Sequence, residues 1–253
     1  MKNFFKSIGL CLGVLILNQI IVGFVTFMGA IVNPDEISKY LYTLVFIGDV
    51  VSLILLHFIY SVYDKQLLSK EIFNKVDFKN IVYIALLGIG LSVLLLTLTG
   101  ILTKFIPSYM DTQEQIKTAS NSILQLLITI ILIPICEEIV FRRVMFGYLK
   151  EHNNIVFAVI LQALVFGLAH GNLVQGIYTF ILGIVLALAY MYFNSLWGCI
   201  ILHIVFNCMG LLIVPKLTAI SPIFGYVIFV IGLGCLVFSL LKLSKKYEHV
   251  LYE

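Results

Sequence analysis

Four ionisable side chains interrupt an apolar stretch in the sequence Pro134-Ile-Cys-Glu-Glu-Ile-Val-Phe-Arg-Arg143. A charge inside hydrocarbon costs at least ~2.5–3.5 kcal/mol on insertion scales, so such a cluster indicates a functional site. Glu138 and Arg142 stand at i and i+4 with the acid first, which is the favourable order for an ion pair on one helix face. Glu137 projects about 100° away. It is a carboxylate that this pair leaves free, and it could act as a general base.

The alternative interpretation of this motif is a structural ion pair that locks helices together. One Glu–Arg pair suffices for a lock, whereas two glutamates and two arginines stand here within seven residues. Pro134 lies one turn before the glutamates, removes one intrahelical hydrogen bond and can kink the helix. A kink would open backbone polar groups and room for water, so we favour a reactive site.

Two histidines and an asparagine follow in later apolar segments. His170 ends the sequence Phe166-Gly-Leu-Ala-His170, and His203 and Asn207 stand at i and i+4 and therefore share a helix face. Taken singly, each of these residues could be a helix-terminal or interhelical polar contact, which is common in membrane bundles. A functional interpretation requires that the helices present them at one depth.

That depth can be compared along the helices at about 1.5 Å per residue. Measured from the turn that follows the charged motif, Glu137 lies about 24 Å along its helix and His170 about 26 Å along the next. His203 and Asn207 lie closer to the turn that precedes their own helix. Their depth matches that of Glu137 and His170 if the hairpin between the motif helix and the next helix protrudes from the membrane. We therefore expect all four side chains to meet at one level.

Together these side chains could hydrolyse a peptide bond with activated water. A poorly solvated glutamate is a suitable general base near neutral pH, so Glu137 would activate the water. His170 could orient the same water. His203 and Asn207 would supply hydrogen-bond donors to the oxyanion that forms on the attacked carbonyl.

A metal-bound water is the rival mechanism. Glu137, His170 and His203 would make a three-ligand zinc site with an open position, although the chain has no HExxH sequence. The spacing alone leaves both mechanisms open. The cysteines are odd in number and lie in apolar segments, so we expect buried thiols without disulfides at Cys11, Cys136, Cys199, Cys208 and Cys235.

Composition identifies the elements that must position these residues. The mean hydropathy is +1.10, and hydrophobic residues make up 61% of the chain while charged residues make up 11%. Apolar runs of about 20 residues recur along the whole length, which predicts an integral membrane protein. The basic residues have no aromatic interleaving, so a nucleic-acid partner is not expected. We expect one membrane domain over residues 1–253, with a motif-bearing core at about 122–214.

The predicted fold is all-α, a polytopic bundle of about eight transmembrane helices. The second helix contains Asp49 and His57, for which we expect structural contacts. The predicted helices are Ile8 to Val32, Leu41 to Tyr63, Ile81 to Leu102, Ser122 to Lys150, Ile155 to His170, Leu173 to Phe193, Leu196 to Val214 and Ile223 to Leu243. We expect a polar segment with a short interfacial helix after the second and a water-exposed loop at 103–121.

Basic residues in the loops predict the orientation of the bundle. With both termini in the cytoplasm, the inner loops and ends carry 12 Lys and Arg residues and the outer loops carry 4. Removing the two motif arginines leaves 10 against 4. We therefore predict cytoplasmic termini, and the size and Ile-, Lys- and Asn-rich composition favour a bacterial plasma membrane.

The ordered motifs Glu137-Glu138-x-x-x-Arg142, Phe166-x-x-x-His170 and His203-x-x-x-Asn207 resemble those of the CPBP intramembrane endopeptidases. This family comprises CAAX prenyl endopeptidases and the bacteriocin-processing and self-immunity membrane proteins called Abi proteins. The resemblance covers about Ser122 to Val214. It implies that Glu137 and His170 activate water, that His203 and Asn207 form the oxyanion hole, and that Glu138 and Arg142 support them.

The resemblance implies a membrane-associated peptide or protein as substrate, in contact with lipid, and it leaves glutamate-dependent and zinc-dependent catalysis both open. We expect cleavage from the cytoplasmic side. A non-catalytic membrane scaffold or a bacteriocin self-immunity protein is the alternative. A transporter using Asp49 and Glu137 is disfavoured because no inverted repeat is visible in the sequence.

Overall fold

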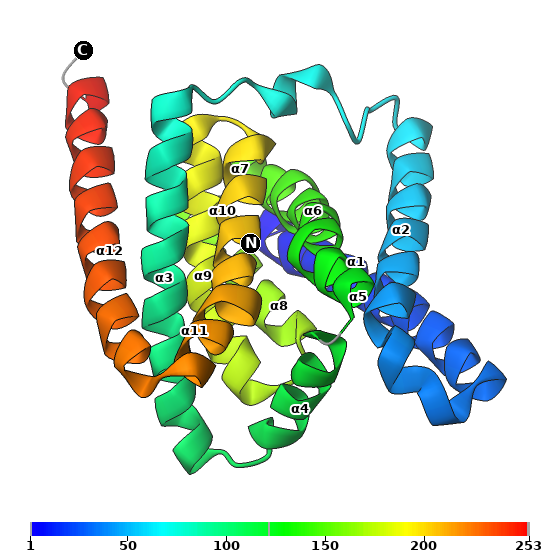
Figure 1. The fold of residues 1–253 in the computed structure, drawn as a ribbon. Helices are drawn as coiled ribbons and strands as arrows, with labels where there is room; N and C mark the ends of the chain where they lie inside the picture. The colour runs from blue at the N-terminus through cyan, green and yellow to red at the C-terminus, as the bar shows by residue number, and fades with distance from the viewer. Residues whose placement is uncertain (1, 121, 252–253) are drawn as a thin grey trace.

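The computed structural model describes residues 2–120 and 122–251, which form helices and connections without any strand. Figure 1 shows these helices as one bundle. In chain order the elements are α1 (Lys2–Val32), η1 (Pro34–Glu36), α2 (Ile37–Val62), η2 (Lys70–Phe73), α3 (Phe78–Phe105), α4 (Tyr109–Ser120), α5 (Ile123–Leu127), η3 (Ile128–Leu132), α6 (Ile133–Glu138), η4 (Ile139–Phe146), α7 (Gly147–His152), α8 (Ile155–Ala169), α9 (Leu173–Phe193), α10 (Leu196–Cys208), η5 (Met209–Ile213), α11 (Val214–Ile220) and α12 (Pro222–Leu251).

The all-α membrane bundle is confirmed, and the protein is an integral membrane protein. In the described part of the chain, seven helical segments are long and apolar enough to cross a membrane. The remaining predicted span, Ile155 to His170, corresponds to the apolar helix α8, which has only 15 residues. Large apolar side chains of α1 and α12, including Phe24, Phe27 and Val230, are exposed, as expected for surfaces that face lipid.

The lysine-rich connections gather at one end of the bundle, which we call the basic face. It comprises the start of α1, the segments 63–77, 153–154 and 194–195, and the second half of α12. Side-chain hydrogen bonds join its parts. Asn153 donates to Ser7 Oγ (2.7 Å), Arg143 Nε donates to the Leu67 carbonyl (2.9 Å), and Asn74 donates to the Asn194 carbonyl (2.8 Å).

The other end, which we call the opposite face, comprises the connections 33–36, 106–108, 170–172 and residue 221. The loop predicted between the third and fourth spans is wrong, because α4 is a helix; residue 121, the last of that loop, lies outside the described residues. The sequence of α4 is polar and carries Asp111, Glu114 and Lys117. Asn172 Nδ2 donates to Thr112 Oγ1 (3.3 Å) and ties α4 to the α8–α9 turn. In Figure 1 α4 lies across the bottom of the bundle.

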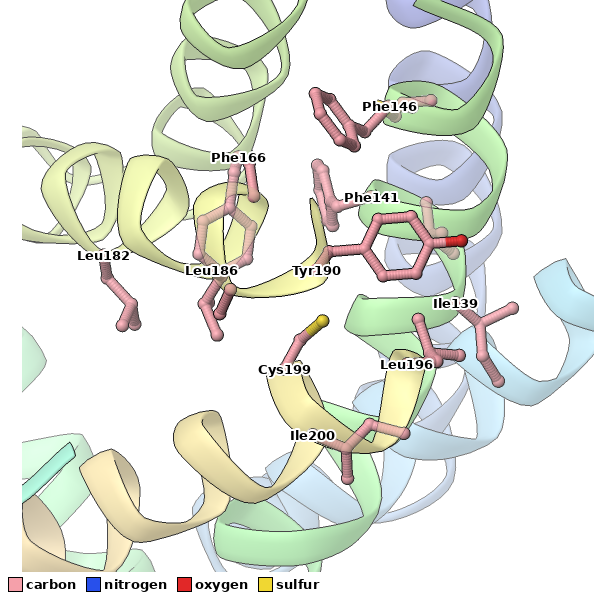
Figure 2. Close-up of a cluster of buried hydrophobic side chains, with 14 of the residues drawn as sticks. Ile139, Phe141, Phe146, Phe166, Leu182, Leu186, Tyr190, Leu196, Cys199 and Ile200 are labelled. Atoms are coloured by element: carbon pink, nitrogen blue, oxygen red, sulfur yellow. The ribbon is translucent and has the colours of Figure 1, made fainter. Parts of the chain in front are cut away.

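A packed apolar core fills the bundle between the motif helix and helices α8, α9 and α10. Phe141, Phe146, Phe166, Tyr190 and Cys199 all turn toward this core (Figure 2). Helices α8 and α9 can approach closely because they meet at small residues: a Cβ built on Gly183 would lie 3.1 Å from Ala163 Cα. This core forms the rigid support of the polar residues described next.

Candidate active site

The charged motif lies on one continuous apolar helix over residues 123–152, but that helix is not a regular α-helix. Two π-helical segments, η3 and η4, flank the short α6 that carries both glutamates. Such π segments occur frequently at functional sites. Pro134, which the sequence predicts to kink the helix, is the second residue of α6, and the helix is widened in the segment η3 just before it.

Glu138 is the centre of a fully buried charged network. Its Oε2 lies 3.1 Å from Arg142 Nε, and both side chains have 0% exposure, so the i, i+4 ion pair predicted from the spacing forms. Its Oε1 lies 2.8 Å from His203 Nδ1 on α10. Sequence reasoning missed this second contact, because spacing within one helix does not show which later helix faces it.

Phe166 of α8 lies between the charged network and the other histidine. The Arg142 guanidinium carbon lies 4.7 Å from the centre of the Phe166 ring, a cation–π distance. The rings of His170 and His203 meet the same phenylalanine edge-on, with centroids 5.1 and 5.9 Å away. This one buried ring therefore fixes the positions of three functional candidates.

Glu137 differs from Glu138 in exposure and in partner. Its side chain is 21% exposed, whereas that of Glu138 has 0% exposure. Glu137 Oε2 lies 3.6 Å from His203 Nε2, so the imidazole of His203 stands between the two glutamates. The carboxylate that the Glu138–Arg142 pair leaves free thus faces a cavity, as the spacing predicts.

His170 caps the C-terminus of α8 and is held by its own helix. Its Nδ1 lies 2.9 Å from the Phe166 carbonyl, which can only accept, so Nδ1 carries the proton and Nε2 is left as an acceptor. Gly171 follows with φ 66°, and Asn172 then caps α9 through the backbone N–H of Val174 (2.9 Å). This tight Gly-Asn turn holds the imidazole at the helix end.

Asn207 is anchored to the motif helix by a carbonyl that proline leaves without a donor. In η3 the N–H of Ile133 donates to the Ile128 carbonyl, five residues back. The next N–H in that pattern would come from residue 134, and proline has none. Asn207 Nδ2 donates to the Thr129 carbonyl instead (3.2 Å).

These residues line one cavity of about 350 Å³. Glu137, His170, His203 and Asn207 all contribute to its wall, as predicted from the sequence. Two more polar residues line it: Asp49, for which the sequence predicted only structural contacts, and Asn18, whose Nδ2 donates to Asp49 Oδ1 (3.0 Å). His57 lies outside the cavity lining, and its exposed ring lies 6.2 Å from that of Phe58.

A second cavity of about 330 Å³ adjoins the first. Both are lined by Tyr178, Phe206 and Asn207, so they meet beside the predicted oxyanion site. The second cavity lies between α3, α4 and η5 and is mostly apolar. The residues that line only this cavity include Ser92, Leu95, Leu96, Thr99, Tyr109 and Gly210.

The predicted zinc ligands do not form a ligand cluster in the part of the chain that the structure describes. No group of three His, Cys, Asp or Glu side chains there is placed to hold a metal ion. The Nδ1 atoms of His170 and His203 are engaged by the Phe166 carbonyl and by Glu138, so Nε2 is the nitrogen with which either ring would bind a metal. All five cysteines are free thiols; Cys11, Cys136 and Cys199 are buried as expected, whereas Cys208 and Cys235 are partly exposed.

Residues 119–209 match the family described as "Type II CAAX prenyl endopeptidase Rce1-like". The resemblance to the CPBP endopeptidases is confirmed. The matched residues include Glu137, Glu138, Arg142, His170, His203 and Asn207, whereas the cavity residues of α1, α2 and α4 lie before them.

A curated relative supports the same family. The Bacillus subtilis (strain 168) protein "Putative membrane peptidase YdiL" is 32% identical over 84 residues, which are 33% of this chain and 34% of that protein. The match thus spans about a third of the length of that relative. No solved structure matches the chain.

Proposed function

We propose that this protein is an intramembrane endopeptidase that hydrolyses a peptide bond in a membrane-associated peptide or protein. The observation that carries the proposal is the placement of Glu137, which is partly exposed in a cavity, beside an imidazole that a second glutamate orients. The CPBP match of residues 119–209 supports the same class of reaction.

Glu137 acts as the general base. It takes a proton from a water molecule, the water oxygen bonds to the carbonyl carbon of the substrate, and the carbonyl π electrons move to the oxygen. His170 accepts a hydrogen bond from this water through its free Nε2. When the C–N bond breaks, Glu137 passes its proton to the leaving amine.

His203 and Asn207 stabilise the oxyanion of the tetrahedral intermediate. One N–H of the Asn207 amide is held by the Thr129 carbonyl, and the second is available to the substrate. A His203 ring protonated on both nitrogens donates to Glu138 and to the oxyanion at once. Removing one donor of this kind costs about 10²–10³ in rate in known hydrolases.

The second cavity binds an apolar side chain of the substrate next to the scissile bond. It meets the first cavity at Asn207, so a peptide with its carbonyl at the oxyanion site extends directly into it. The apolar lining favours a large aliphatic or aromatic residue.

The test is cleavage of membrane-associated candidate peptides by purified protein in lipid, read by mass spectrometry. The wild type should cleave. The Glu137→Gln variant should cleave ~10²–10⁴-fold more slowly, because it lacks the general base. Glu151→Gln, which changes an exposed glutamate at the basic face, is the matched control. Undiminished cleavage by Glu137→Gln would refute the proposal, and parallel reactions with a chelator separate the metal-free mechanism from the zinc-dependent one.

A non-catalytic scaffold is the second candidate, and the buried Glu138–Arg142–His203 network favours it, since such a network can also join helices. A scaffold predicts that Glu137→Gln retains function in a binding or immunity assay, whereas a protease loses it.

A further inference from the structure

The candidate cavity lies toward the opposite face of the bundle. Its wall includes Tyr42 near the start of α2, Gln115 of α4, His170 at the α8 terminus and Gln175 near the start of α9. All of these stand next to the connections 33–36, 106–108 and 170–172. In Figure 1 this is the bottom of the bundle, where α4 lies.

Hydrogen bonds tie the elements around this cavity to one another. Gln19 Nε2 of α1 donates to the Ala169 carbonyl beside His170 (3.1 Å). On the motif helix, Gln125 accepts from the Tyr42 backbone N–H (3.1 Å) and also bonds Thr43 Oγ1. The mouth is therefore built from α1, α2, α4 and the α8–α9 turn.

The basic face is closed by packing. Leu67 and Ile72 of the connection 63–77 are 2% and 7% exposed and belong to the apolar core. Beneath them Phe146, Leu149 and Leu196 are fully buried. A substrate cannot pass from this face to Glu137 without displacing that core.

The charge distribution gives the two faces an orientation. Counting described side chains, the basic face carries eight Lys or Arg residues and the opposite face carries four. The eight are Lys6, Lys65, Lys70, Lys75, Lys79, Arg143, Lys150 and Lys242, and the four are Lys39, Lys104, Lys117 and Lys216; the side chains of Lys2, Lys245 and Lys246 lie outside the described residues. Arg142 is left out because it is fully buried in its ion pair. The positive-inside rule places the basic face in the cytoplasm.

We propose that the cavity opens to the side of the membrane away from the cytoplasm and takes its substrate there. Given the proposed endopeptidase function, the substrate class is a polypeptide segment in the outer leaflet or at its surface, after its export. This revises the cytoplasmic-side cleavage expected from the sequence, which did not show on which side of the membrane the catalytic residues lie.

Cysteine labelling tests the orientation independently of catalysis. Gln115→Cys at the mouth and Lys75→Cys on the basic face both replace exposed residues. A membrane-impermeant maleimide added to intact cells should label Gln115→Cys, and should label Lys75→Cys only after permeabilisation. The wild type measures the background from the native cysteines. Protection of Gln115→Cys in intact cells would overturn the proposal.

Sealed vesicles then test substrate access. Peptide added outside should be cleaved by right-side-out vesicles and spared by inside-out vesicles, and maleimide on Gln115→Cys should block the cleavage. Cleavage by inside-out vesicles alone contradicts the proposed side. If the labelling gives the expected result and neither orientation cleaves, the orientation stands and the proposed peptidase function is the part that fails.

Discussion

The single residue Glu138 has two roles. It neutralises Arg142 inside the membrane, and it accepts from His203 Nδ1, which sets the direction of the other ring nitrogen toward Glu137. A carboxylate that accepts from one ring nitrogen fixes the orientation of the whole imidazole ring. The structural and the catalytic interpretations of the motif therefore converge on the same side chain.

Paired substitutions separate these two tasks. Glu138→Leu alone strands a buried arginine and should cost about 3–5 kcal/mol of stability, because breaking a buried pair leaves an uncompensated charge. Glu138→Leu combined with Arg142→Met should recover the thermal midpoint toward that of the wild type. Cleavage should stay low in the double variant, since His203 still lacks its acceptor. Recovery of both stability and activity would show that Glu138 serves only as a lock.

Individual residues also show how far the sequence could be interpreted. The spacing predicted the Glu138–Arg142 pair, the free Glu137 and the common cavity of Glu137, His170, His203 and Asn207. These follow from helix periodicity and from depth along helices, which are local properties.

What the sequence missed depends on contacts between distant segments. The Glu138–His203 bond spans 65 residues, and Asp49 reaches the cavity only because α2 packs against α6. Neither follows from spacing within a helix.

At the scale of helices, the same irregularity occurs twice around the cavity. Segments η3 and η5 are both π-helical, and each is followed by a residue and then a proline, Pro134 or Pro215. A proline ring clashes with the carbonyl four residues back in a regular α-helix, and a widened turn relieves that clash. In η3 the carbonyl of Thr129, five residues before Pro134, would accept from the backbone N–H that proline lacks, and it accepts from Asn207 instead.

Pro134→Ala tests this arrangement without touching a polar side chain. The new backbone N–H can donate to the Thr129 carbonyl and compete with Asn207 for it. We expect kcat to fall, but by less than the ~10²–10³-fold that complete loss of an oxyanion donor causes, and we expect KM to change little. Asn207→Ala gives the full effect for comparison. A Pro134→Ala protein with wild-type kcat would mean that the carbonyl does not position Asn207.

The second cavity leads to a prediction about specificity. A Cβ built on Gly210 meets only Ser92 Oγ, at 3.4 Å, so a larger side chain there points into free volume. Gly210→Leu should therefore lower kcat/KM for peptides with a large apolar residue beside the scissile bond and spare those with alanine. Gly13→Leu, on α1 where a Cβ meets nothing within 4 Å, is the control. Equal loss for both peptides would place the apolar residue elsewhere.

For the whole molecule, the short helix α8 sets the depth of the chemistry. Its 15 residues rise about 22 Å, whereas the hydrocarbon core of a bilayer is about 30 Å thick. Because α8 starts at the basic face, His170 at its end lies roughly 8 Å inside the other surface, or the bilayer thins there. The cavity thus combines membrane depth with a short path to water.

This geometry predicts that cleavage depends on bilayer thickness. In proteoliposomes of lipids with longer acyl chains, the turn at 170–172 and the polar helix α4 would be drawn into hydrocarbon, where their backbone and charged groups lose water. We expect the cleavage rate to fall steadily from 14-carbon to 22-carbon lipids. The expected rise in the activation free energy is the cost of hydrophobic mismatch, on the order of a fraction of a kcal/mol per Å of added thickness. The thermal midpoint measured in each lipid separates slower catalysis from unfolding. A rate that does not change across the series while the protein stays folded would show that the mouth already lies in water, outside the hydrocarbon.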